Sequence, residues 1–400
     1  MKKYKLGDIL ELQRGYDLPH SEMEEGNVPV AGSSGIIGYH SISKIDPPCI
    51  TIGRSGSVGK LFFYNEAIWP HNTSLYIKSF KNNNEKYIFY LLKTVDFERL
   101  CDSSVVPSLN RNFVYPIKVP FYDNIADQQK IAAVLSSLDD KIALNNRINA
   151  KLEQMAKRLY DYWFVQFDFP NADGKPYKST GGKMVWNEEL KREIPEGWEV
   201  KKLGELFTTN RGVSYSTKTI TGDIGIPMIN LASFSPDGSY KIDGIKTYTG
   251  EYTEEKVLKP FDLVMCNTQQ TAIDFSKDII GKALLVPDIF EGDITSSHHV
   301  NTLKVHNEKL KFYLYRLFNT DYFHAYISHY ASGTNIMGLD FAGVENYSAV
   351  IPSEEILSKF ADFTLDIEKK KSEIIRENKK LISLRDRLLP LLMNGQVIVN

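Results

Sequence analysis

The stretch NEKYIFYLL at residues 84–92 recurs as NEKLKFYLY at residues 307–315. Both copies place aromatic and aliphatic residues at helical spacing, which predicts a helix with one buried face in each copy. We therefore expect Phe89 with Phe312, and Leu91 with Leu314, to lie in the core. A chain that carries two copies of one module presents two related surfaces.

Other short segments repeat in the same order along the chain. They are Lys-Leu-Gly with an acidic residue at 5–8 and 202–205, Arg-Gly at 14–15 and 211–212, an aliphatic-Gly-Lys segment at 58–60 and 280–282, and an Asn in a long helical stretch at 149 and 378. Drifting offsets between the copies are typical of diverged duplicates with loop insertions. The sequence therefore predicts two duplicated globular units.

Length and composition agree with a multidomain folded protein. Four hundred residues exceed what one hydrophobic core usually serves, and hydrophobic residues make up 42% of the chain. The formal net charge is −2, whereas a protein that relies on phosphate neutralisation alone for tight DNA binding is usually basic. If DNA is the ligand, local patches or partner subunits must supply much of the electrostatics.

Cysteine usage and hydropathy indicate the compartment. Cys49, Cys101 and Cys266 are odd in number and are not at metal-ligand spacing, which favours a reducing environment. No apolar signal-peptide core follows Met1, and no stretch approaches 18 uninterrupted apolar residues. We expect a cytoplasmic protein without a membrane segment.

The alternation of short β-like runs with helical segments predicts a mixed α/β (α+β) fold in each unit, with a helix near residues 84–100. Long stretches without Gly or Pro follow at residues 124–160 and 354–389. Each predicts a helix about 50 Å long. The expected organisation is a globular domain at 1–122, a long helix at 123–165, a Gly-, Pro- and Ser-rich linker and lead-in at 166–193, a second domain at 194–352, and a second long helix with the C-terminal tail at 353–400.

Apolar residues in the two long helices follow the 4-3 spacing of a coiled-coil seam. The predicted seam is Ile131, Leu135, Leu138, Ile142, Asn149, Leu152, Leu159, Phe360, Ile367, Ile374, Asn378, Leu381 and Leu388. Antiparallel packing, with a pseudo-twofold axis between the domains, is the most economical arrangement. The alternative is two separate surface helices that each cover their own domain.

Polar residues of the long helices have two interpretations. The matching Asn149 and Asn378 are either a register-setting pair or exposed on a frayed seam. The runs Lys369–Lys371 and Lys379–Lys380 are expected to be solvated.

Several segments match an enzyme motif in part, but no motif is complete. GRSGSVGK at 53–60 lacks the first glycine of a phosphate loop and the Ser or Thr after Lys60. The Asp-Pro-Pro segment at 46–48 is followed by Cys49, whereas amino-methyltransferases carry an aromatic residue that stacks on a flipped base. His298 and His299 are adjacent, and on a strand they would face opposite ways, so no shared metal site is expected. The modules are typical of binding units without catalytic or metal sites.

Three segments together resemble the specificity subunits of type I restriction-modification enzymes. They are YWFVQFD at 162–168, IPEGW at 194–198 leading into KLGE at 202–205, and LRDRLLP at 384–390 followed by Asn394-Gly395. The resemblance extends over nearly the whole chain. Gln166 and Asn394 depart from the residues that the family often carries at these places.

The resemblance implies two target recognition domains that each read one half of a bipartite site in double-stranded DNA. The long helices would form the antiparallel coiled coil and bind two methyltransferase subunits, which two motor-nuclease restriction subunits join. S-adenosylmethionine, ATP and magnesium would then belong to the partners, and this chain would hold no cofactor.

The dimensions suit this division of labour. Half-sites on one face of B-DNA are about 34–36 Å apart per turn. Two domains held apart by long helices of about 50 Å could therefore contact half-sites about one turn apart, with an uncontacted spacer between them. Because the two copies differ in their loops, an asymmetric target is expected.

Candidate DNA contacts are polar loop residues that are able to reach base edges or phosphates. In the first domain they are Arg14, Arg54, Ser55, Lys60, His71, Asn72, Ser108, Asn110, Arg111 and Asn112. In the second they are Arg211, Tyr215, Asn267, Gln269, Gln270, Lys282, His298, His299, Thr334 and Asn335.

Two groups of candidates carry more specific expectations. Gln269 and Gln270 are the first choice for reading adenine, because an amide makes a bidentate pair with that base, although a Gln pair in a loop is more often solvated. Arg14 with Arg211, and Lys60 with Lys282, persist in both copies and are expected to hold phosphate, to cap a turn or to pair with a carboxylate.

Two rival functions remain open at this stage. One is an autonomous methyltransferase or nuclease with duplicated recognition domains, which binding of S-adenosylmethionine would support. The other is a coiled-coil scaffold whose domains bind protein, which a failure to select DNA would support.

Overall fold

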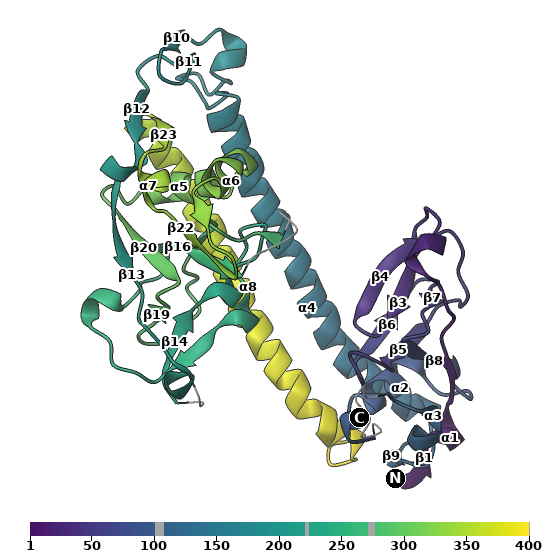
Figure 1. The fold of residues 1–400 in the computed structure, drawn as a ribbon. Coiled ribbons are helices and arrows are strands. Elements are labelled where there is room, and N and C mark those ends of the chain that lie inside the picture. The colour runs from purple at the N-terminus through teal and green to yellow at the C-terminus, as the bar shows by residue number, and fades with distance from the viewer. Residues whose placement is uncertain (101–107, 221–223, 271–276, 400) are drawn as a thin grey trace. The chain divides into compact units, whose positions relative to one another are not determined.

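The computed structural model describes residues 1–100, 108–220, 224–270 and 277–399, with only the backbone at Gln270 (Figure 1). Cys101 lies outside these residues. The chain divides into unit 1, Met1–Leu144 with Asn378–Asn400, and unit 2, Asn145–Glu377.

The described residues of unit 1 form small sheets and short α-helices. Its strands are β1 (Lys2–Lys5), β2 (Glu11–Arg14), β3 (Val28–Gly32), β4 (Gly35–His40), β5 (Cys49–Gly53), β6 (Leu61–Tyr64), β7 (Trp69–Pro70), β8 (Ser74–Ser79) and β9 (Lys118–Phe121), and its short helices are α1 (Leu6–Ile9), α2 (Glu85–Leu92) and α3 (Arg111–Val114). The sheet orders are β2-β8-β5-β6, β4-β3-β7 and β1-β9.

Unit 2 repeats these sheets and adds two more. Its strands are β10 (Met184–Asn187), β11 (Arg192–Pro195), β12 (Glu199–Lys202), β13 (Phe207–Arg211), β14 (Ile226–Ile229), β15 (Lys246–Tyr248), β16 (Leu263–Cys266), β17 (Thr268–Gln270), β18 (Ala283–Leu285), β19 (Thr295–Ser296), β20 (Val300–Val305), β21 (Ala331–Ser332), β22 (Ile336–Leu339) and β23 (Ser348–Ile351), and its short helices are α5 (Leu310–Phe318), α6 (Asp321–Ser328) and α7 (Ala342–Glu345). The repeated orders are β13-β20-β16-β18, β15-β14-β19 and β12-β23, and the additional sheets are β17-β22-β21 and β10-β11.

The correspondence of sheets confirms the predicted duplication. Each unit contains a strand that pairs in parallel with a two-residue strand, β3 with β7 and β14 with β19. In both units the NEK helix packs on the last strand of the four-stranded sheet, α2 on β6 and α5 on β18.

The NEK segments form core helices, as predicted. Leu91 and Leu314 are fully buried, and Phe312 is 4% exposed. Phe89 is half-buried and packs edge-on against Phe63 at a centroid distance of 5.5 Å. The first helix ends at Leu92, so the predicted extension to residue 100 is wrong.

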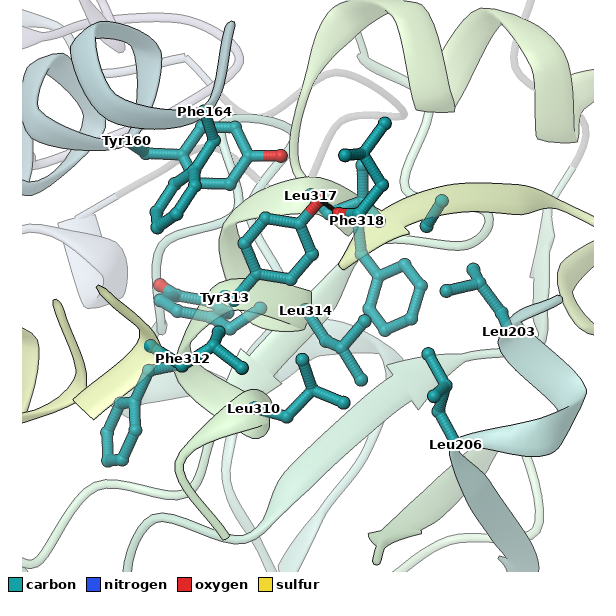
Figure 2. Close-up of a cluster of buried hydrophobic side chains, with 14 of the residues drawn as sticks. Tyr160, Phe164, Leu203, Leu206, Leu310, Phe312, Tyr313, Leu314, Leu317 and Phe318 are labelled. Atoms are coloured by element: carbon teal, nitrogen blue, oxygen red, sulfur yellow. Dashed lines mark hydrogen bonds between the residues drawn. The ribbon is translucent and has the colours of Figure 1, made fainter. Parts of the chain in front are cut away.

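The core of unit 2 surrounds α5. Figure 2 shows Leu310, Leu314 and Phe318 of this helix gathered with Leu203 and Leu206. Burial of these apolar side chains stabilises the folded unit, which explains why the apolar residues of the repeated segment are retained in both copies.

Aromatic side chains close the other side of this core. Phe164 meets Tyr313 of α5 edge-on at a centroid distance of 4.9 Å, and Tyr160 lies 5.6 Å from the same ring (Figure 2). The segment predicted as a linker also contributes, because Phe169 is buried and stacks on Trp198 at 4.8 Å.

The two long helices are α4 (Ile125–Tyr160) and α8 (Glu354–Met393). Their bounds match the predicted stretches, except that α8 continues through Pro390. In unit 2, Asn145 Nδ2 donates to Glu377 Oε2 at 2.8 Å and Lys371 Nζ donates to Glu153 Oε2 at 2.6 Å. Later residues of α4 thus meet earlier residues of α8, which is antiparallel packing.

Burial along the predicted seam is uneven. Ile131, Leu135, Phe360, Ile367 and Ile374 are buried. The half-buried members are Leu138, Ile142, Asn149, Leu152, Leu159, Asn378, Leu381 and Leu388. Asn145, which lies beside this seam, is buried and donates to Glu377, whereas Asn149 Oδ1 has no hydrogen-bond partner among the described residues.

A buried ionic cluster interrupts the seam in unit 2. Arg316 of α5, with a side chain 4% exposed, pairs with Glu153 of α4 and with Glu368 of α8, the latter at 2.9 Å. Lys371 also pairs with Glu368, at 2.9 Å. The expectation of a solvated Lys371 is wrong, because this side chain supplies the second cation that the two carboxylates require.

Removing one partner of a buried ion pair leaves an uncompensated charge, which typically costs 3–5 kcal/mol. We expect Arg316→Met to lower the free energy of unfolding by about this amount in denaturant titrations. The matched control is Arg376→Met, because Arg376 pairs with Asp288 at 3.5 Å with both side chains exposed. The control should change stability by less than about 1 kcal/mol, and equal losses in both variants would contradict this account of the cluster.

The cluster also predicts a pH dependence. Burial opposes ionisation of Glu153, but Arg316 and then Lys371 overcome it and lower the pKa of this carboxyl from 4.5 to about 2. A lowered folded-state pKa stabilises the protein fully above about pH 4.5, and this contribution is lost as the pH falls toward 2. Unfolding measured from pH 6 to pH 2 should show the stability gap between wild type and Glu153→Gln shrinking with acid, and a constant gap would refute it.

Candidate nucleic-acid interface

The ends of equivalent strands create the same backbone frame in both units. Each Arg-Gly segment ends a strand, β2 or β13, and its glycine lies against a neighbouring loop. A Cβ at Gly15 would overlap the carbonyl oxygens of Pro70 and His71, and one at Gly212 those of Ser296 and Ser297. Only glycine fits such an approach of one backbone to another.

Backbone hydrogen bonds around the two glycines match one for one. Gly15 N to Ser74 O (3.0 Å) matches Gly212 N to Val300 O (3.2 Å), Tyr16 N to Pro70 O (2.8 Å) matches Val213 N to Ser296 O (2.7 Å), and His71 N to Ala31 O (2.9 Å) matches Ser297 N to Ile229 O (2.8 Å).

A second set of matched bonds fixes the loops after β5 and β16. Gly59 N to Gly53 O (2.9 Å) matches Gly281 N to Cys266 O (2.9 Å), Arg54 N to Thr73 O (2.9 Å) matches Asn267 N to His299 O (3.0 Å), and Leu109 N to Arg54 O (2.9 Å) matches Leu339 N to Asn267 O (2.9 Å). The bridge of Ser55 with Ser108 matches the pairing of Thr268 with Gly338. Arg54 and Asn267 therefore occupy equivalent positions.

These matches define two equivalent clusters. Site 1 consists of Arg14, Arg54, Ser55, Thr73 and Ser108. Site 2 consists of Arg211, Asn267, Thr268, His299 and Gly338. The backbone is shared, and all but the first member of each site differ in side chain.

Site 1 is rich in guanidinium groups. Arg14 is exposed and lies 3.7 Å from Asp17, which also accepts a hydrogen bond from Asn72. Arg54 Nη1 reaches the carbonyl oxygen of Asn72 at 3.5 Å. The strand-end arginines and one carboxylate leave a locally positive surface, although the whole chain carries a net charge of −2.

Most of the other candidate residues of unit 1 make hydrogen bonds within the protein. His71 shares a hydrogen bond with Thr73 at 2.9 Å, and burial lowers the pKa of its imidazole. Asn110 caps α3 by accepting from the Asn112 amide at 3.0 Å, and Arg111 donates to the Leu12 carbonyl at 3.1 Å. The side chain of Lys60 is exposed at the start of β6.

Site 2 contains a pocket of about 240 Å³. Its lining comes from Arg211, Asn267, Thr268, Asn301, Gly338, Leu339 and Phe341. Arg211 Nε donates to the carbonyl oxygen of His298 at 2.8 Å, which holds the guanidinium at the pocket wall. Asn301 was not among the residues expected from the sequence, and it joins the site because it pairs with Arg211 across strands β20 and β13.

The paired histidines lie beside this pocket. Their ring centroids are 3.8 Å apart, and His299 shares a hydrogen bond of 2.7 Å with Thr268. Burial, followed by the charges of His298, Arg211 and Lys246, lowers the pKa of His299. The expectation that the two rings face opposite ways is wrong, because they precede β20 in a turn. The described residues contain no group of three or more potential metal-ligating side chains.

Tyr215 extends this ring cluster. The ring centroid of Tyr215 lies 5.4 Å from that of His298. The ammonium group of Lys246 lies 5.4 Å from the same Tyr215 centroid. Thr334 and Asn335 are exposed in the connection between β21 and β22, and β22 carries Gly338.

Two predicted contacts of unit 2 face the protein interior. Gln269 is 3% exposed and its Oε1 accepts from the amide of Ile279 at 2.7 Å, so its side chain is not available for base contact. Lys282 is 4% exposed, and burial lowers the pKa of its ammonium group. The structure thus contradicts both roles, because each side chain is used in packing. Gln270 forms part of β17, and its side chain lies outside the described residues.

Cys49 and Cys266 are both buried in the core. Cys49, after the incomplete methyltransferase motif, is 2% exposed, and burial raises the pKa of its thiol to about 11. Cys266 is fully buried, and its pKa is raised to about 12 for the same reason. Both residues therefore serve as small apolar core groups. Across the described segments, no helix combines the length and apolar character needed to span a membrane.

Comparison with known proteins identifies the family to which these sites belong. The family model described as the type I restriction modification DNA specificity domain matches residues 1–154 and again residues 195–377. The MjaIX specificity subunit of a type I restriction enzyme from Methanocaldococcus jannaschii is 28% identical over 324 residues, which cover 78% of this chain and 69% of that protein. The HindI specificity subunit from Haemophilus influenzae is 26% identical over 331 residues and covers 68% of each chain.

The fold has a counterpart among solved structures. The S subunit of a type I restriction-modification system from M. genitalium aligns with a TM-score of 0.59 and 15% identity, covering 98% of this chain and 96% of that one. This likeness concerns the fold, and the double match to the family model identifies the family. The chain therefore belongs to the type I restriction-modification specificity subunits, the non-catalytic components that recognise DNA.

Proposed function

We propose that unit 1 and unit 2 each read one half of a bipartite site in double-stranded DNA, through site 1 and site 2 respectively. The observation that carries this proposal is the pairing of one backbone frame with two sets of side chains. A shared frame gives both sites the same means of approaching DNA, and different side chains give them different base preferences. The target is then asymmetric.

The proposal assigns different tasks to repeated and to divergent residues. Arg14 and Arg211 occur in both copies and are exposed, which suits phosphate contacts without sequence information. Arg54 and Asn267 differ at one equivalent position, which suits base recognition. The exposed Lys60 is also suited to a phosphate contact, whereas Lys282 is buried and is not assigned to DNA contact.

The catalytic work belongs to partner subunits in this proposal. Two methyltransferase subunits would use S-adenosylmethionine, and two restriction subunits would use ATP and magnesium. The target recognition domains correspond to residues 1–122 and 194–352, and the long helices set the distance between the half-sites. This chain then directs where its partners act.

Mapping of modified bases in cells that carry or lack this gene tests the function directly. We expect one additional methylated motif with two unlike halves and a spacer of fixed length. A motif that is continuous or palindromic would contradict the proposal, as would the absence of any gene-dependent motif.

Single substitutions should separate base contacts from phosphate contacts. We expect Arg54→Ala to cost about 1–3 kcal/mol of binding free energy on the preferred site and to relax only one half of it. Arg14→Ala is the matched control and should weaken binding to all sequences alike, with a shallower salt dependence. Both are measured with the enzyme assembled with its modification subunits on a panel of oligonucleotides. Identical selectivity profiles for the two variants would refute the assignment.

The role of the helices predicts a change in spacer length. Removal of one helical turn from both α4 and α8 should shorten the preferred spacer and leave both half-sites unchanged. Selection from oligonucleotides with varied spacers measures this preference. A changed half-site with a constant spacer would show that the helices do not set the distance.

A further inference from the structure

Arg54 and Asn267 occupy equivalent positions in the two units but have different hydrogen-bonding groups. A guanidinium group has only donors, whereas an amide has both a donor and an acceptor end. Because the backbone amide and carbonyl groups of both residues make matched bonds, their side chains leave equivalent points of the frame. A difference in what they recognise therefore follows from the side chains alone.

The amide of Asn267 is committed at its donor end. Its Nδ2 donates to the backbone carbonyl of His298 at 3.3 Å and to Asn301 Oδ1 at 2.7 Å. A backbone carbonyl is able only to accept, so this contact fixes the nitrogen on that side of the amide. Asn267 thus offers an acceptor and no free amide donor to a ligand.

The acceptor end of Asn267 is unsatisfied. The residue is 8% exposed, and its Oδ1 is buried without a hydrogen-bond partner among the described residues. The side chain also lines the pocket of site 2, together with Arg211 and Thr268. A buried acceptor without a donor is unfavourable, and a ligand that inserts an N–H group into the pocket would relieve it.

DNA presents a matching donor in the major groove. The N6 amino group of adenine and the N4 amino group of cytosine are donors at the base edge, whereas guanine presents the acceptors N7 and O6 there. Asn267 therefore complements an exocyclic amino group. Arg54, which carries only donors, complements guanine.

We propose that Arg54 and Asn267 are a pair of specificity-determining residues, Arg54 donating to guanine in one half-site and Asn267 accepting from the amino group of adenine or cytosine in the other. The assignment rests on the proposed function and names the base chemistry at each site. Asn301 acts as a positioning residue for Asn267, because its Oδ1 accepts from the Asn267 amide.

Base analogues test the proposal with the wild-type enzyme, assembled with its modification subunits, once the motif is mapped. In the half-site assigned to unit 2, adenines are replaced one at a time by purine and cytosines by 2-pyrimidinone, each of which lacks the amino group. One replacement should weaken binding about tenfold, and its identity decides between adenine and cytosine. In the other half-site, 7-deazaguanine should weaken binding at one position, whereas inosine, which keeps N7 and O6, should not.

Substitution of each side chain in turn assigns the effects to the residues. Arg54→Asn should abolish the sensitivity to 7-deazaguanine without altering the amino-group sensitivity in the other half-site. Asn267→Ser should abolish only the amino-group sensitivity. Thermal unfolding of each variant identifies any loss of fold, and in that event the analogue series on the wild-type enzyme decides.

The outcomes separate this inference from the proposed function. An enzyme that selects a bipartite motif but tolerates every amino-group deletion in both half-sites overturns the role of Asn267 and leaves the function intact. Sensitivity that survives Arg54→Asn or Asn267→Ser in a folded variant overturns the pairing of residue and base. An enzyme that selects no motif at all refutes the proposed function itself.

Discussion

Both recognition units depend on the close passage of one backbone across another at Gly15 and Gly212. A side chain at either position would overlap carbonyl oxygens of the neighbouring loop. The approach allows the end of β2 or β13 to bond to that loop, and the loop in turn bonds to the residue after β5 or β16. Site 1 and site 2 thus inherit their geometry from a contact that only glycine permits.

The repeated sequence segments were sufficient to predict two related modules and part of their cores. Leu91 and Leu314 are core residues, and the aliphatic-Gly-Lys segments precede β6 and β18, because packing and positive-φ turns constrain residue type strongly. Arg54 and Asn267 lie in polar segments that the sequence marks as candidate DNA contacts, without any repeated motif that links the two positions. Their equivalence could not be predicted, because it follows from hydrogen bonds between segments far apart in sequence.

Side-chain direction is where sequence reasoning failed. Gln269 looked like a base reader, yet alternation along β17 turns it toward Met337 and the amide of Ile279. The two histidines looked opposed because a strand was assumed, whereas a turn brings their rings together. Lys371 looked solvated because its neighbours are charged, but its ammonium group pairs with Glu153 of α4 and Glu368 of α8, and its side chain is only 16% exposed. In each case the deciding contact came from another part of the fold.

The matched bonds that hold the two sites are made by main-chain atoms. Every amino acid except proline carries these groups, so exchanges at Arg54, Thr73, Asn267 or His299 leave the matched bonds in place. The bonds that hold the frame are therefore independent of the side chains to which we assign target choice. Under the proposed function, single substitutions at these positions would change the DNA target of the protein while leaving the main-chain bonds that hold the two sites intact.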